Sequence, residues 1–146
     1  MNVLISEVAG PARWGQFNLK LAWVPTFFGA SLGAVHSIHL AQIDANGNFL
    51  ANHHMPEIYK PNSSNWAFEI PGASALTFPG KHKRPILILS QTAAGYYPFE
   101  LVMPSETPYN AVAAFLAANR QTPLREMARC IVDRSMIPAN RFGLHF

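Results

Sequence analysis

The sequence predicts an α+β fold: a mostly antiparallel, curled sheet or partly open barrel of about seven or eight strands, followed by two C-terminal helices. Short apolar and alternating segments, separated by Gly, Pro and Asn, fill roughly residues 1–104. The hydrophobic period becomes helical over roughly residues 105–136. A length of 146 residues suits a single domain, 1–146, with one core.

The strands are predicted from alternation and from turn residues. Apolar residues occupy every second position within 15–24, which places one face on a core. Asn46-Gly47 separates the runs 35–43 and 49–54 and predicts a hairpin. Further strands are predicted at 65–70, 76–78, 85–90 and 97–103. Residues 85–90 lack polar alternation, so we expect them to form the most buried, central strand.

Two helices are predicted from their start signals. Thr107-Pro108 and Thr122-Pro123 each place an N-cap residue before a proline suited to the first helical position. The first helix would bury Tyr109, Val112, Ala113, Leu116 and Ala117, and the second Leu124, Met127, Ala128, Ile131 and Val132.

The composition excludes two classes of protein. Only 13% of residues are charged and 49% are hydrophobic, which excludes an intrinsically disordered chain and a coiled coil. The same scarcity of charge, with 12% aromatic residues, favours apolar surface that is buried against a partner. One hypothesis is therefore a homo-oligomeric protein-interaction or binding module.

The basic residues are concentrated in the second half of the chain, where eight of the eleven lie between Lys81 and Arg141. The predicted hairpin tip carries Lys81, His82, Lys83 and Arg84, and the second predicted helix carries Arg125 and Arg129 one turn apart. Such groups suit a phosphate backbone. These six residues predict a small, non-enzymatic module that binds DNA or RNA.

These basic residues also have a structural explanation. Charges at a tight turn keep a sheet edge solvated, and Arg129 has the helical spacing to pair with Glu126 and Asp133.

A histidine pair provides the third hypothesis, a metal-dependent or small-molecule enzyme. With Asn46 and Gly47 as the turn, counting outward places His39 opposite His54. A zinc or iron site needs three or four ligands, so these two remain weak metal candidates, and a surface histidine pair is the alternative. The sequence lacks a glycine-rich phosphate loop, a metal-spaced cysteine pair and a nucleophile elbow, so it favours a non-enzyme without a cofactor.

The cysteine content and the N-terminal sequence suggest a compartment. The single cysteine, Cys130, excludes an intramolecular disulfide and is expected to be a buried thiol. The N-terminal region lacks the apolar run of a signal peptide. Residues 21–43 carry no Asp, Glu, Lys or Arg, but prolines, serines and histidines interrupt them, so we expect no membrane partner. The sequence predicts a cytoplasmic protein.

Overall fold

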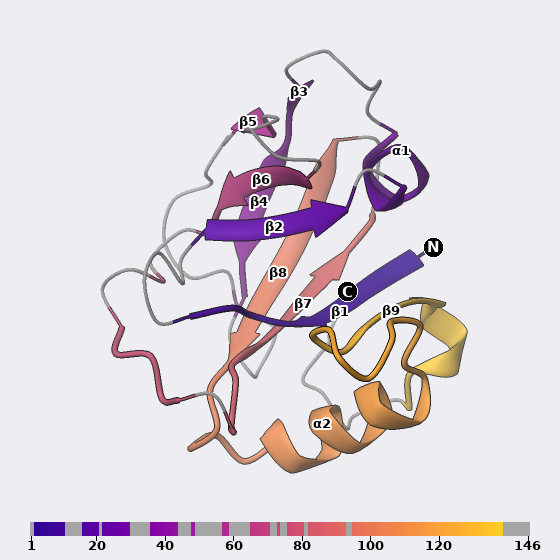
Figure 1. Ribbon diagram of the computed structural model, residues 1–146. Helices are drawn as coiled ribbons and strands as arrows, with labels where there is room; N and C mark the ends of the chain where they lie inside the picture. The colour runs from indigo at the N-terminus through magenta and orange to yellow at the C-terminus, as the bar shows by residue number, and fades with distance from the viewer. Residues whose placement is uncertain are drawn as a thin grey trace.

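The central element of the structure is a mixed sheet (Figure 1). The computed structural model describes residues 2–10, 16–20, 22–29, 36–43, 48, 57–58, 65–70, 73, 76–80, 82–92 and 95–138. Within them, a five-stranded sheet has the order β4-β8-β7-β1-β9. Its strands are β1 (Asn2–Glu7), β4 (His39–Gln42), β7 (Ile86–Ser90), β8 (Tyr96–Val102) and β9 (Arg129–Asp133). Strand β4 pairs with β8 in parallel, and the other neighbours are antiparallel.

Shorter elements surround this sheet. Two antiparallel pairs join β2 (Gln16–Lys20) to β6 (Asn65–Glu69) and β3 (His36–Ser37) to β5 (Glu57–Ile58). The helices are α1 (Trp23–Phe28), α2 (Tyr109–Ala118) and a 3-10 turn, η2 (Arg134–Met136). The molecule is therefore α+β.

The sheet separates two apolar clusters. On one face, side chains of β7 and β8 pack with β2, β6 and α1, and Phe17, Phe27, Phe68, Tyr97 and Phe99 are among the buried rings there. On the other face, alternate residues of β1, β7 and β9 pack against Val112 and Leu116 of α2. Figure 1 shows the corresponding layers, with β2 and β6 in front of the sheet and α2 below it.

Strand β7 is buried on both faces of the sheet. All five of its residues are buried, and it is the middle strand, which confirms the prediction for 85–90. Strand β1 lies beside it and has the same apolar character in Val3, Leu4 and Ile5. No strand had been predicted at 2–7.

The predicted fold class is wrong in two respects. In the described part of the chain the strands form open sheets and not a barrel, and only one of the two predicted C-terminal helices is present. The first is α2, which buries Val112 and Leu116. In place of the second, residues 122–127 are turns and β9 follows.

Pairing with β1 explains why the second helix does not form. Strand β9 hydrogen-bonds along the whole of β1, from Asn2↔Asp133 to Ser6↔Arg129, and it buries Cys130 and Val132. A helix would lose this ladder and leave one side of β1 without a partner. Leu124, predicted to be in the core, is 89% exposed.

Three further predictions differ from the structure or are tested by it only in part. Residues 76–80 are irregular, so the basic loop precedes β7 without being the tip of a hairpin. The strand predicted across 15–24 ends at Lys20, and the half-buried Trp23 begins α1. The Asn46-Gly47 turn lies outside the described residues; farther along, His36 pairs with Ile58, one residue from the predicted register, and β4 pairs with β8.

We expect Leu87→Ala to lower the free energy of unfolding by about 3 kcal/mol, because it leaves a cavity in the fully packed middle strand. Leu87 is 1% exposed. Urea denaturation measures the change, and Lys83→Ala, at an exposed position, is the control that should shift stability by less than about 0.5 kcal/mol. Equal effects of the two substitutions would contradict this account of the core.

Candidate functional site

The basic loop before β7 is fixed at one end of the sheet. The Val8 N–H donates to the Pro85 carbonyl at 2.9 Å, and the Tyr109 hydroxyl of α2 donates to the Arg84 carbonyl at 2.8 Å. Both contacts use the backbone of the loop and leave its charged groups available. His82 and Lys83 are exposed and Arg84 is half-buried. Lys81 lies outside the described residues.

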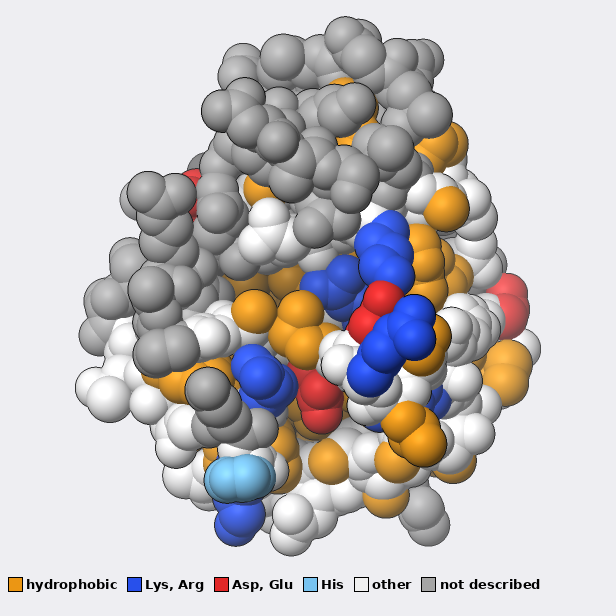
Figure 2. Space-filling model, viewed as in Figure 1, with side chains coloured by type: hydrophobic (Ala, Val, Ile, Leu, Met, Phe, Trp, Pro, Cys, Tyr) orange, Lys and Arg blue, Asp and Glu red, His pale blue; other side chains and the backbone are white. Residues whose placement is uncertain are grey.

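A second basic segment, residues 120–129, reaches the same end of the sheet. The Glu7 N–H donates to the Ala128 carbonyl, and a Glu7 carboxylate oxygen accepts from the Ala128 N–H, both at 3.0 Å. Because Glu7 and Val8 are consecutive, the two basic segments flank the same end of β1. We call this region, made of residues 82–84 and 120–129 together with Lys20, the basic end of the sheet. Figure 2 shows Lys and Arg side chains on one face, with carboxylates among them.

Arg120 stabilises the second basic segment by hydrogen bonds to its backbone. Its guanidinium donates to the carbonyls of Thr122, at 2.8 Å, and of Pro123 and Glu126. These carbonyls belong to the turns that replace the predicted helix, so Arg120 supplies donors that helical N–H groups would otherwise provide. Arg125, at the outside of this loop, is exposed. Its side chain has no hydrogen bond or ion pair with another described residue.

The same loop closes the outer edge of β9. The Gln121 side chain accepts from the Ile131 N–H at 2.9 Å and donates to its carbonyl at 3.0 Å. The Gln121 N–H donates to the Arg129 carbonyl at 2.8 Å, and the Thr122 hydroxyl accepts from the Arg129 N–H at 3.2 Å. These contacts satisfy edge groups that could otherwise pair with a further strand. They also hold the loop against the sheet.

Arg129 occupies a different environment from Arg125. It is 8% exposed, its Nε donates to the Ser6 hydroxyl at 2.8 Å, and its guanidinium carbon lies 5.1 Å from the centre of the Phe17 ring. Burial lowers its pKa to about 10, although Glu126 and Glu7 oppose the shift. The guanidinium therefore remains charged at neutral pH. The predicted pair of arginines one helical turn apart does not exist, because no helix forms there.

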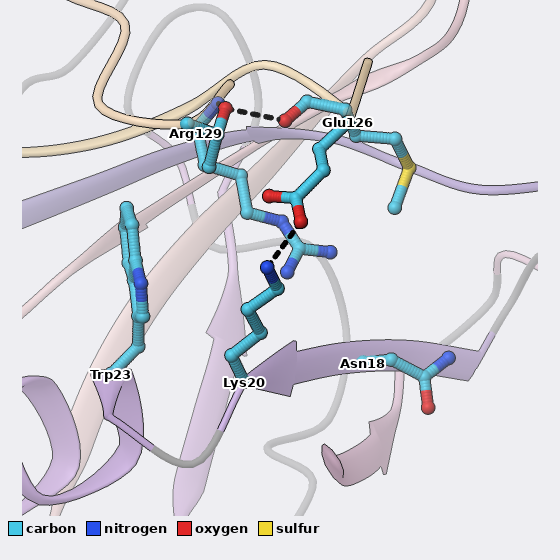
Figure 3. A pocket seen from close by; sticks show the side chains of 7 residues that line it. Asn18, Lys20, Trp23, Glu126 and Arg129 are labelled. Atoms are coloured by element: carbon cyan, nitrogen blue, oxygen red, sulfur yellow. Dashed lines mark hydrogen bonds and ion pairs between the residues drawn. The ribbon is translucent and has the colours of Figure 1, made fainter. Parts of the chain in front are cut away.

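A pocket of about 240 Å³ lies where β2, α1 and this loop meet. It is lined by Asn18, Lys20, Trp23, Thr122, Glu126, Met127 and Arg129. Figure 3 shows the Lys20 ammonium group paired with the Glu126 carboxylate, with the Arg129 guanidinium beside them. The pairing with Lys20 is the main cause of a lowered Glu126 pKa, and Arg125 and Arg129 add to it. The pocket therefore combines a carboxylate with several cations.

Sequence reasoning identified the two basic segments but missed Lys20, Trp23, Arg120 and Glu126 as members of one site. Lys20 and Glu126 are 106 residues apart. No local sequence signal indicates that β2 and the 120–129 loop meet.

Of the predicted histidine pair, the structure describes only His39. The backbone N–H of His39 donates to the Gly95 carbonyl at 2.7 Å, and its ring packs edge-on against Tyr96, its neighbour on β8. His54 lies outside the described residues, so the predicted pairing is untested. No group of three or more His, Cys, Asp or Glu side chains that could hold a metal ion occurs in the described ranges.

Comparison with known proteins shows the fold. No protein-family model and no curated protein matches this sequence. Among solved structures, the N-terminal domain of Helicobacter pylori LlaJI.R1 is similar, with a TM-score of 0.60 and 12% sequence identity. The match covers 91% of this chain and 98% of that one. Separately, none of the helices in the described residues has the length and apolar character needed to cross a membrane.

We expect the Cys130 thiol to react slowly with an aromatic disulfide reagent at about pH 8, because burial hides the sulfur and suppresses the thiolate. Cys130 is 0% exposed, and burial raises its pKa to about 11. Absorbance of the released thiol measures the rate, and the same protein unfolded in guanidinium is the control, in which reaction should be rapid and complete. Equally fast reaction of the folded protein would show that the thiol is accessible.

Proposed function

We propose that this protein is a non-enzymatic module that binds nucleic acid through the basic end of the sheet. The proposed contacts include the residues predicted from the sequence: Lys81, His82, Lys83, Arg84, Arg125 and Arg129. They would bind the phosphate backbone, which accounts for most of the affinity of sequence-independent binding. DNA and RNA remain alternatives that the experiment distinguishes.

The observation that carries the proposal is the convergence of two basic segments on one end of β1. Lys83, Arg84 and Arg125 are at least partly exposed, and their side chains form no hydrogen bond or ion pair with other described residues. The Glu7 carboxylate accepts from the Ala128 N–H, and the carboxylate of Glu126, within the second segment, pairs with Lys20, so both acids are engaged. The basic end therefore retains an excess of positive charge toward solvent, which attracts a polyanion.

The likeness to the LlaJI.R1 domain supports this proposal at the level of the fold. It extends over nearly all of both chains, so the same arrangement of strands exists in another protein. Because the two sequences are 12% identical, the argument for binding depends on the side chains of this chain. A cytoplasmic location stays a prediction.

The two other hypotheses have less support. Among the described residues, the large apolar side chains that are exposed are Leu76, Leu124 and Met136, from three different segments of the chain. Gln121 and Thr122 also close the β9 edge to sheet extension. For the enzyme hypothesis, His54 lies outside the described residues, and within the described ranges no group of three or more His, Cys, Asp or Glu side chains could hold a metal ion.

We expect the protein to bind random-sequence oligonucleotides at low salt. If Lys83, Arg84 and Arg125 neutralise three phosphates, the logarithm of the affinity should fall with the logarithm of the salt concentration with a slope of about −3. Fluorescence anisotropy with duplex DNA, single-stranded DNA and duplex RNA measures this slope and identifies the preferred form. Combined Lys83→Ala, Arg84→Ala and Arg125→Ala substitutions should abolish most of the binding while the protein stays folded, because these side chains are not in the core.

Arg134→Ala is the matched control. Arg134 begins η2, directly after Asp133, which pairs with Asn2 at the opposite end of β1. Its loss removes one positive charge, as each of the three substitutions does, and should leave the affinity nearly unchanged. The proposal fails if no oligonucleotide binds at low salt, or if Arg134→Ala and the triple variant weaken binding equally.

A further inference from the structure

We infer that the pocket between β2, α1 and the 120–129 loop is a phosphate subsite, and that the Glu126 carboxylate occupies the anion position in the free protein. This inference rests on the proposed function, because it adds a defined phosphate contact to the basic end. It differs from the proposal in assigning a role to a buried cation and to an acid.

Arg129 is the fixed part of this subsite. Its side chain is held from behind, by the Ser6 hydroxyl on Nε and by the Phe17 ring beneath the guanidinium. In the described part of the chain, its terminal NH₂ groups have no hydrogen-bond partner, and the side chain lines the pocket. A guanidinium fixed in this way presents planar donors that match the oxygens of a phosphate.

Lys20 supplies the second cation. It comes from the end of β2 and reaches across the pocket to the Glu126 carboxylate (Figure 3). Its side chain is 55% exposed, so it can follow an incoming anion out of this pairing. An ammonium group is a compact point charge that a phosphate oxygen satisfies as well as a carboxylate does.

Glu126 is the group that a phosphate would replace. Lys20, Arg125 and Arg129 all lower its pKa, and Lys20 and Arg129 line the same pocket. The Glu126 side chain is 27% exposed, and among the described residues its carboxylate hydrogen-bonds only to Lys20. The Glu126 carboxylate therefore occupies an anion position that nearby cations stabilise, and no other contact with a described residue holds it there.

The remaining residues that line the pocket suit a phosphodiester better than a free phosphate ion. About 240 Å³ exceeds the space that a phosphate group alone requires. The half-buried Trp23 and Met127 form apolar walls, and Asn18 and Thr122 add neutral polar groups. An adjoining sugar would find both kinds of contact there. A free phosphate or a nucleotide shares the recognised chemistry, so the experiment must separate these sources.

We expect Glu126→Gln to tighten duplex binding by about three- to tenfold, because it removes a competing charge and frees Lys20 and Arg129. The salt slope should steepen by about 0.9, corresponding to one more neutralised phosphate. Glu69→Gln is the matched control, since Glu69 is an exposed acid at the other end of the β2–β6 pair from Lys20, and it should leave both values unchanged. If circular dichroism shows that Glu126→Gln impairs folding, Lys20→Gln is used in its place. Lys20→Gln should weaken binding and make the salt slope less steep.

A second measurement separates this inference from the proposed function. Inorganic phosphate and a nucleoside monophosphate are titrated into the protein while the indole N–H signal of Trp23, assigned with Trp23→Phe, is followed by NMR. A shift that is larger in Glu126→Gln than in the unsubstituted protein supports the subsite. If these anions shift the signal but no oligonucleotide binds, the subsite stands and nucleic-acid binding is overturned. If oligonucleotides bind but Glu126→Gln behaves like Glu69→Gln and phosphate leaves the signal unchanged, the subsite is overturned.

Discussion

The placement of β1 between β7 and β9 is the constraint on which the rest of the structure depends. Its six residues form hydrogen-bond ladders with strands on both sides, so β1 joins residues 86–90 to residues 129–133. One alternating set of its side chains lies in each apolar cluster, with Leu4 on one face and Val3 and Ile5 on the other. The end of β1 then fixes both basic segments through Glu7 and Val8. The site is therefore a consequence of sheet order.

This dependence explains which parts of the fold were predictable from sequence. Strand β7, strand β8 and helix α2 are defined by their own residues, and the patterns in 85–90, 97–103 and 109–117 identified them. The region 122–133 is different, because Leu124, Ala128 and Ile131 fit a helical period as well as they fit a loop and a strand. Only pairing with β1, more than a hundred residues away in the sequence, decides between a helix and a strand here. Tertiary pairing therefore overrides the local pattern.

The candidate site is also predictable from the sequence only in part. The charge runs in 81–84 and 120–129 stand out in the sequence, and the structure brings the described residues of both to one end of the sheet. The interior of the pocket had no comparable signal, because Lys20 and Trp23 belong to a strand and a helix that pack on the sheet from the other part of the chain. Their meeting with Glu126 and Arg129 depends on side-chain packing between layers, which periodicity does not describe.

The pairing of Asn2 with Asp133 also sets an order of events during synthesis. Strand β1 emerges from the ribosome before both of its partners, so its ladder with β7 waits for residue 90 and its ladder with β9 waits for residue 133. Such long-range contacts must close large loops before they stabilise anything, which slows folding. Until then, the apolar run of β1 has an open edge on each side and is exposed to unwanted pairing. The sheet is therefore complete only after β9 has been synthesised.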